Sequence, residues 1–156
     1  ARFEGVAEGW TTEVPDFHVL AVECVAGPDA QILPRTGLPD DAFVHDGKIT
    51  KRTQRALALS KLVPVRDGVL WDVGCGCGSV AIEWMRAGRE ARAIGIESQE
   101  KRRAMAEENA LRLGAPKLKL VEGTAPDALA GLPAPDAVFI GGGISRETIA
   151  ARALMR

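Results

Sequence analysis

The sequence lacks the features that mark membrane-spanning, secreted and nucleic-acid-binding proteins. It has no apolar run of about 18 residues, the length that a transmembrane helix needs, although 46% of its residues are hydrophobic. Residues 1–5 do not form the apolar core of a signal peptide. The net charge of −1 gives no bulk attraction to nucleic acid or to an anionic membrane. We therefore expect a globular, cytoplasmic domain without a nucleic-acid or membrane partner.

Cysteine and histidine are also scarce. The three cysteines do not suggest a disulfide framework, which favours a reducing compartment. Cys75 and Cys77 form a C-x-C pair that could bind metal, but His18 and His45 lie far upstream. Tetrahedral zinc needs four ligands of this kind at suitable spacing, so we predict no metal site. We expect Cys24 to be a buried apolar residue.

A glycine-rich stretch at residues 70–84 is the most informative part of the chain. An apolar run ends in the acid Asp72, alternating glycines follow at 74, 76 and 78, and helical spacing resumes at Val80. Glycine allows a sharp turn with positive φ and leaves no Cβ to block a ligand. The first turn of the following helix offers free N–H groups. This pattern predicts a strand, a loop and a helix that bind a nucleotide-type cofactor.

The spacing of the glycines distinguishes between cofactors. A dinucleotide loop has the pattern G-x-G-x-x-G, but its third glycine position is occupied here by Ser79. A P-loop is excluded because no Gly-Lys-Ser/Thr follows. Asp-x-Gly-x-Gly-x-Gly, ending at Gly78, is similar to the loop of class I S-adenosylmethionine methyltransferases. The loop alone is also compatible with a plain structural turn.

Regular spacing of acidic strand ends strengthens the interpretation of the loop. Residues 93–97 read as a second strand that ends in Glu97, and residues 118–124 as a third that contains Glu122. Each acid follows the previous one by 25 positions, a step typical of parallel βαβ units. A carboxylate at the end of the second strand can accept both ribose hydroxyls. The alternative for Glu97 is a solvated strand-end carboxylate.

The remaining segments complete an α/β pattern. A fourth strand at 136–140 precedes Gly141 and Gly142. Helices are predicted at 51–63, 80–87, 99–113, 126–130 and 145–156, with Thr50 and Ser98 as N-caps. The predicted fold is Rossmann-like: a parallel sheet with helices on both faces, truncated after the fourth strand. We expect Lys51, Arg52 and Arg55 on the exposed side of the first helix.

Residues 1–36 differ in character from the rest. Residues 17–25 read as a strand, and a Pro/Gly-rich linker follows. One interpretation is the tail of a preceding domain, with the main domain at 37–156; the other is a strand that joins the domain's own sheet. The segment 48–50, with Lys48 and Thr50, either folds over the cofactor or only leads into a helix that covers the sheet.

Six segments together resemble the methyltransferase domain of the decarboxylating precorrin methyltransferases and their stand-alone counterparts in cobalamin synthesis. They are residues 37–43, 49–51, 72–79, 94–97, 122–126 and 136–142. The glycine loop and Glu97 indicate only the superfamily, whereas the other segments indicate the precorrin branch. In the fused bacterial members a tetrapyrrole methylase domain comes first, and residues 1–27 resemble its tail.

The resemblance implies methyl transfer from S-adenosylmethionine to the meso carbon C-15 of a precorrin, with loss of CO₂ from an acetate side chain. It implies that the cofactor contacts Thr50, Asp72, Gly74, Cys75, Gly76, Gly78, Glu97, Thr124, Ala125 and Gly141. It also implies that donor and acceptor meet at Gly141 and Gly142. We expect Lys48, Lys51, Arg52 and Arg55 to hold the acidic substrate. Family members oligomerise, and an unpaired edge strand here favours the same.

Two alternatives to this function remain open from the sequence. One is a methyltransferase for another small molecule. The other is a non-catalytic nucleotide-binding module, because the predicted sheet has four strands whereas a complete class I domain has seven.

Overall fold

The computed structural model describes residues 1–28, 30 and 32–141, which form two compact units. The first unit is Ala1–Ile32 and the second begins at Leu33, whereas the sequence suggested a boundary after residue 36. The described residues of the first unit contain no helix or strand. The predicted strand at 17–25 is therefore wrong. Its apolar side chains are exposed, 97% in the case of Phe17, and no described strand pairs with its backbone.

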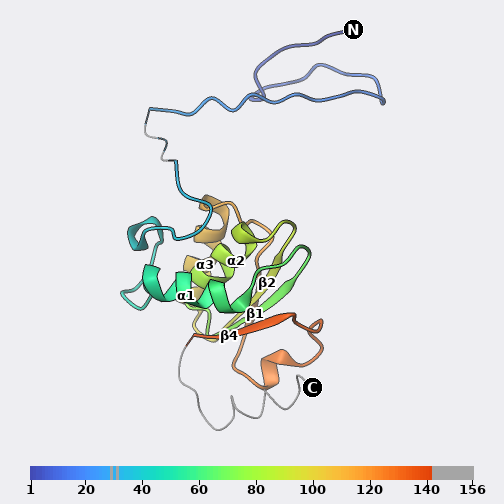
Figure 1. Cartoon of the computed structure of the whole chain (residues 1–156). Helices are drawn as coiled ribbons and strands as arrows, with labels where there is room; N and C mark the ends of the chain where they lie inside the picture. The colour runs from blue at the N-terminus through green and yellow to red at the C-terminus, as the bar shows by residue number, and fades with distance from the viewer. Residues whose placement is uncertain (29, 31, 142–156) are drawn as a thin grey trace. The chain divides into compact units, whose positions relative to one another are not determined.

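The second unit is built on a parallel sheet, as predicted (Figure 1). Its described strands are β1 (Val69–Val73), β2 (Arg92–Glu97), β3 (Lys119–Glu122) and β4 (Ala137–Ile140), in the order β3-β2-β1-β4. Every pairing is parallel. All of β1 is buried and β2 is buried except at its first residue. Their nearly continuous apolar character follows from coverage of both sheet faces.

Three helices and two 3-10 turns accompany the sheet in the described part of the chain. The helices are α1 (Arg52–Leu62), α2 (Ser79–Ala87) and α3 (Glu100–Arg112), and the turns are η1 (Asp40–Ala42) and η2 (Asp127–Leu129). Leu70 of β1 packs with residues of α1 and α2 on one face. Trp71, the next residue, packs with Leu129 of η2 on the other face. Successive side chains of β1 therefore point to opposite faces of the sheet and pack into two separate hydrophobic clusters.

Both predicted N-caps are wrong. Lys51 and Gln99 occupy the N-cap positions of α1 and α3, and neither side chain makes a capping hydrogen bond. Two carboxylates supply acceptors instead, one of them 12 positions before its donor and the other only two. Asp40 Oδ1 accepts the Arg52 N–H at 2.9 Å, and Glu97 Oε1 accepts the Gln99 N–H at 3.0 Å. The predicted helices at 51–63, 80–87 and 99–113 are otherwise confirmed within one or two residues at each end.

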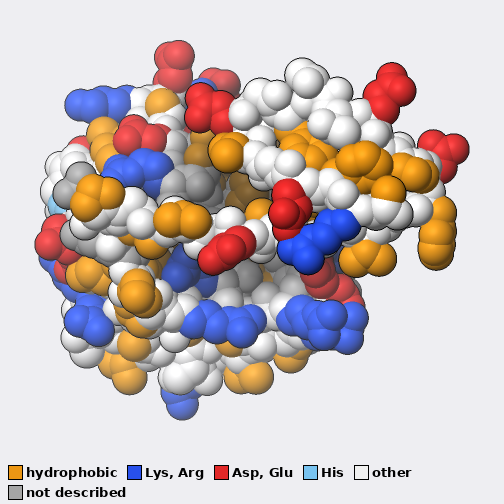
Figure 2. Space-filling model, turned by 90° about the horizontal axis from the view of Figure 1, so that it is seen from above, with side chains coloured by type: hydrophobic (Ala, Val, Ile, Leu, Met, Phe, Trp, Pro, Cys, Tyr) orange, Lys and Arg blue, Asp and Glu red, His pale blue; other side chains and the backbone are white. Residues whose placement is uncertain are grey.

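The surface of the described residues is mixed in character. On the face seen in Figure 2, acidic and basic side chains are both present, with apolar side chains between them. No described helix is long and apolar enough to cross a bilayer. The predicted helix at 145–156 lies outside the described residues.

Candidate functional site

The carboxyl ends of the parallel strands meet at one edge of the sheet. The strand register pairs Val73 with both Ile96 and Ile140, and pairs Glu97 with Glu122. Ligands of open α/β sheets bind outside this edge. The loops that follow β1, β2 and β3, together with Gly141 after β4, therefore form the candidate site.

The loop after β1 adopts a conformation that requires glycine. Gly74, Gly76 and Gly78 have φ values of +71°, +56° and +77°, in the left-handed region that other residues rarely adopt. Gly78 also forms the N-cap of α2. A Cβ on Gly78 would lie 3.1 Å from the Cβ of Ala106 in α3, which shows how closely the loop packs on that helix. The loop is thus more crowded at Gly78 than at Gly76, where a Cβ would meet only the Lys48 carbonyl oxygen, at 3.9 Å.

Glu97 joins the end of β2 to this loop. Its Oε2 accepts the backbone N–H of Gly76 at 3.0 Å, while its Oε1 accepts the N–H of Gln99. Glu97 as a whole residue is 5% exposed. Each carboxylate oxygen has two lone pairs, so both retain capacity to accept from a hydroxyl. Glu97 can therefore fix the loop and still receive a diol.

Asp72 is buried at the end of β1 with one oxygen unpaired. Its Oδ2 accepts the N–H of Ala81 in α2 at 3.0 Å. Its Oδ1 has no hydrogen-bond partner among the described residues. Burial, together with the negative charge of Glu97 and despite the Ala81 hydrogen bond, raises the pKa of Asp72 to about 7. A buried, unpaired carboxyl oxygen beside an open loop fits a ligand that brings a donor or a positive charge.

Cys75 and Cys77 serve packing within the loop. Cys75 lies against Gly95 of β2, where a Cβ would come within 2.8 Å of its Sγ. Burial raises the pKa of both thiols, so they stay protonated and poorly nucleophilic. Among the described residues no three His, Cys, Asp or Glu side chains are grouped as a metal site would require.

The loop after β3 and Gly141 after β4 complete the described part of the edge. Thr124 is exposed and Ala125 is half-buried, where it packs against the core cluster that contains Leu129. The Gly141 N–H donates to the carbonyl of Val73 at 2.8 Å, which continues the β4–β1 pairing. A Cβ on Gly141 would lie 2.7 Å from the Gly74 oxygen, so only glycine permits this approach. Gly142 lies outside the described residues.

The segment before α1 lies over the glycine-rich loop. The carbonyl oxygen of Lys48 is 3.9 Å from the position of a Cβ on Gly76, and Thr50 is half-buried nearby in the chain. Of the four predicted substrate-binding cations, Lys48, Lys51 and Arg52 are exposed. The segment at residues 48–50 therefore lies beside the glycine-rich loop, which is the loop that Glu97 holds through the N–H of Gly76.

The prediction that Arg55 is exposed and binds substrate is wrong. Arg55 was expected on the exposed side of α1, but its side chain is 0% exposed. The guanidinium forms ion pairs with Asp40 and Glu83, at 2.7 Å and 2.9 Å. Burial of an arginine is tolerated when its guanidinium is paired and hydrogen-bonded, and here each of the three guanidinium nitrogens has at least one acceptor. Arg55 is thus occupied inside the fold and does not belong with the substrate-binding cations.

Two polar residues that shape the site, Asn109 and Arg103, were not among the predicted site residues. Asn109 of α3 is 0% exposed and donates to the carbonyl of Cys77 at 3.0 Å. Arg103 donates to the carbonyls of Glu97 and Ser98, which fixes the turn after β2. An asparagine within the apolar stripe of a helix was the available signal, because buried amides are nearly always hydrogen-bonded.

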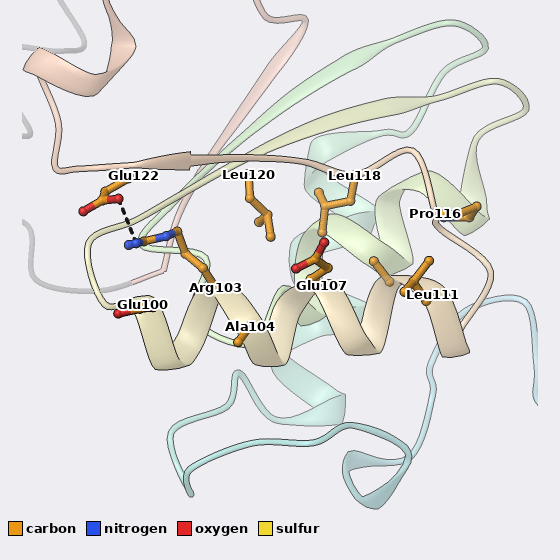
Figure 3. Close-up of a pocket in the computed structure, with 10 residues that line it drawn as sticks. Glu100, Arg103, Ala104, Glu107, Leu111, Pro116, Leu118, Leu120 and Glu122 are labelled. Atoms are coloured by element: carbon orange, nitrogen blue, oxygen red, sulfur yellow. Dashed lines mark ion pairs between the residues drawn. The ribbon is translucent and has the colours of Figure 1, made fainter.

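An open groove of about 630 Å³ lies beside this edge, between α3 and β3 (Figure 3). Arg103 crosses it to pair with Glu122 at 2.9 Å. The groove is lined by Glu100, Arg103, Ala104, Glu107, Ala110, Leu111, Pro116, Leu118, Leu120 and Glu122. The glycine-rich loop does not line it, so it is separate from the candidate site.

Comparison with known proteins identifies the family. Residues 41–156 match the family model of the precorrin methyltransferase domain. The chain is 51% identical over 137 residues to a precorrin-6Y C(5,15)-methyltransferase [decarboxylating] of Sinorhizobium sp., a match that covers 87% of this chain and 33% of that protein. It is 41% identical over 111 residues to a probable cobalt-precorrin-6B C(15)-methyltransferase (decarboxylating) of Pyrobaculum calidifontis, covering 69% and 57% of the two chains.

A solved structure agrees with these matches. The C-terminal domain of precorrin-6Y C5,15-methyltransferase from Rhodobacter capsulatus superimposes with a TM-score of 0.73 and 45% identity, over 80% of this chain and 68% of that one. The present chain spans about a third of the length of the Sinorhizobium relative and somewhat more than half of the Pyrobaculum one. On the family match and these likenesses, the chain belongs to the family of precorrin methyltransferase domains.

Proposed function

We propose that this chain is a methyltransferase domain that uses S-adenosylmethionine to methylate C-15 of a precorrin, with decarboxylation of an acetate side chain, in cobalamin synthesis. The observation that carries the proposal is the combination of family membership with a glycine-rich loop fixed by Glu97 through Gly76. The names of the relatives agree with methyl transfer and decarboxylation.

The residues at the strand edge suit the parts of this cofactor. Glu97 would receive the ribose hydroxyls, and Asp72, with its unpaired Oδ1, would face the ammonium group of the methionine part. The remaining contacts we assign to Thr50, Gly74, Cys75, Gly76, Gly78, Thr124, Ala125 and Gly141, with Thr124 and Ala125 beside the adenine. S-adenosylhomocysteine would leave as the product.

When bound, the cofactor supplies a methyl group that its sulfonium has already activated. Transfer of that methyl to C-15 would leave S-adenosylhomocysteine, and loss of CO₂ from the acetate side chain would leave the electron pair of the broken carbon–carbon bond in the conjugated ring. The task of this chain is to align donor and acceptor near Gly141 and Gly142 and to exclude water.

The exposed cations before α1 suit a substrate with many carboxylates. Lys48, Lys51 and Arg52 are exposed, and Lys51 lies 3.8 Å from Asp40, a weak pair that a substrate carboxylate could replace. We assign these three residues to substrate binding. Arg55 is left out because its donors are already used inside the fold.

We also propose a tetrapyrrole methylase domain before this one, and a cytoplasmic homo-oligomer. Exposed apolar side chains in Ala1–Ile32, such as Phe17 and Val19, suit a segment that packs on a preceding domain. Cys24 is exposed, so the expectation that it would be buried is wrong, and its free thiol suits a reducing compartment. Sedimentation of the full-length protein would report the oligomeric state.

Titration calorimetry with S-adenosylhomocysteine tests the cofactor assignment, with NAD as the control. We expect micromolar affinity for the first compound and none for the second. Affinity for NAD alone would refute the methyltransferase assignment and favour a different nucleotide-binding function. Mass spectrometry of a precorrin incubated with S-adenosylmethionine then tests the reaction, because methylation adds about 14 Da and decarboxylation removes about 44 Da, shifts that follow from the bonds made and broken.

A further inference from the structure

The two ends of the segment at residues 38–50, which we term the cover segment, meet at one buried side chain. Arg55 donates through Nη2 to the carbonyl of Leu38, at the start of the segment. Through Nη1 it donates to the carbonyl of Thr50, at its end, at 2.5 Å, and to Asp40 Oδ1 at 2.7 Å. A single guanidinium therefore closes the segment into a loop beside α1 (Figure 1).

The same guanidinium is anchored to the helix that follows the glycine-rich loop. Its Nε donates to Glu83 Oε1 of α2 at 2.9 Å. The Glu83 oxygens also accept the N–H groups of Gly37 and Leu38, at 2.6 Å and 3.0 Å. Because arginine presents donors in several fixed directions, it can serve both ends of the segment and α2 together. A lysine at this position could not reach all of these acceptors.

Asn109 of α3 holds the middle of the cover segment. Its Oδ1 accepts the N–H of Val44 at 2.8 Å, and its Nδ2 donates to the Val44 carbonyl at 2.9 Å. The same Nδ2 donates to the carbonyl of Cys77 at 3.0 Å. One buried amide thus joins the cover segment directly to the glycine-rich loop.

An outer ion pair fixes the part of the segment nearest the loop. Asp46 accepts from Arg102 of α3 at 2.9 Å and from the N–H of Lys48 at 3.0 Å. Both charged side chains are partly exposed, so salt screens this pair more than the buried contacts. The next contact is the Lys48 carbonyl near Gly76.

We propose that Arg55 and Asn109 are positioning residues, which hold the cover segment closed over the glycine-rich loop and thereby set the affinity of the cofactor site. Neither residue needs to touch the cofactor. Arg55 fixes the ends of the segment and Asn109 fixes its middle, so loss of either one frees the backbone of Lys48 and Thr50 above Gly76. The inference rests on the proposed function for what the site binds.

The test compares Arg55→Lys and Asn109→Leu with a matched control, Arg86→Lys. Arg86 of α2 also donates to backbone carbonyls, namely those of Pro34 and Arg35 at 2.7 Å and 3.0 Å and that of Leu113. None of these carbonyls lies in the cover segment. All three variants therefore lose side-chain hydrogen bonds to the backbone, part-buried in the case of Arg86 and Leu113, but only the first two release the segment.

Hydrogen exchange in the ligand-free chain measures closure of the segment, and calorimetry with S-adenosylhomocysteine measures its consequence. We expect the Val44 amide to exchange at least tenfold faster in Arg55→Lys and Asn109→Leu, and affinity to fall at least tenfold. In Arg86→Lys we expect a lower melting temperature, with Val44 exchange and affinity within twofold of the original protein. If Arg55→Lys does not fold, Asn109→Leu supplies the same comparison.

Two results would overturn the inference: unchanged Val44 exchange in the first two variants, or an equal loss of affinity in Arg86→Lys. An original chain that fails to bind S-adenosylhomocysteine would reject the proposed function instead. In that case, exchange in the ligand-free chain still decides whether Arg55 and Asn109 close the segment.

Discussion

Glu97 at the end of β2 accepts the backbone N–H of Gly76 at 3.0 Å, so the proposed ribose-binding carboxylate also sets the shape of the loop after β1. Its other oxygen accepts the N–H of Gln99. Both carboxylate oxygens therefore face N–H donors. This arrangement makes the site sensitive to replacement of the carboxylate by an amide of the same shape.

Glu97→Gln should weaken S-adenosylhomocysteine binding at least tenfold, nearly as much as Glu97→Ala. The glutamine side chain must turn its NH₂ group toward one of the two backbone N–H groups, which costs about 1–3 kcal/mol for the unsatisfied donor. Calorimetry on both variants measures the effect. Glu100→Gln, an exposed residue in the first turn of α3, is the control and should bind normally. Full affinity in Glu97→Ala would refute the assignment of the ribose site.

Asp72 should make stability depend on pH between about 4 and 7. Its pKa is raised from 3.8 to about 7, chiefly by burial, so folding favours the protonated carboxyl. The stabilisation that this residue provides is complete below pH 4 and is lost as the pH rises to about 7, by up to about 4 kcal/mol. Urea unfolding at several pH values should show that the stability of the original chain falls relative to Asp72→Asn over this range. Parallel curves for the two proteins would contradict the prediction.

Gly78→Ala should destabilise the chain more than Gly131→Ala does. Both glycines have positive φ, +77° and +73°. A methyl group at 78 would meet the Cβ of Ala106 at 3.1 Å, whereas nothing lies within 4 Å of one at 131. Backbone strain costs each variant about 1–2 kcal/mol, and the crowding adds about 1–3 kcal/mol at 78 alone. Thermal unfolding measures the difference in stability. Equal losses of stability in the two variants would show that the loop shifts to accommodate the methyl group at position 78 without an energetic penalty.

The triple variant Lys48/Lys51/Arg52→Ala should weaken precorrin binding and leave S-adenosylhomocysteine binding within a few fold. These side chains are exposed, so their attraction for a polycarboxylate is long-range and falls with added salt. Binding titrations at two salt concentrations measure both effects. Lys61→Ala, near the other end of α1, is the matched control. Unchanged precorrin affinity in the triple variant would remove these residues from the substrate site.

The parts of this fold that depend on local pattern were predictable. The strands, the glycine-rich loop and the helices follow from apolar periodicity and from glycine spacing, which neighbouring residues determine. Burial of Arg55 was not predictable in this way. Its neighbours Lys51 and Arg52 suggested an exposed face, whereas its partners Asp40 and Glu83 lie 15 and 28 positions away.

The predicted N-caps of α1 and α3 were wrong because other side chains accept the hydrogen bonds at these helix starts. Thr50 and Ser98 are suitable N-caps by residue type, but the acceptors come from Asp40 and Glu97. Asp40 lies 12 positions before Arg52, so local pattern does not reveal this partner. Glu97 lies only two positions before Gln99 and takes the place of the expected Ser98 as the nearby acceptor. The strand predicted at 17–25 shows the converse, because high strand propensity without a pairing partner does not produce a strand.

Closure of the cover segment at Arg55 has a consequence for the entropy of binding. A segment whose ends already meet has lost much of its conformational freedom before a ligand arrives. The cost of ordering residues 38–50 is then met when the chain folds and not when it binds. Heat or denaturant that loosens Leu38 or Thr50 from the guanidinium should therefore reduce ligand affinity well before the sheet unfolds. Binding at this site would then report local opening of the segment earlier than any probe of the core.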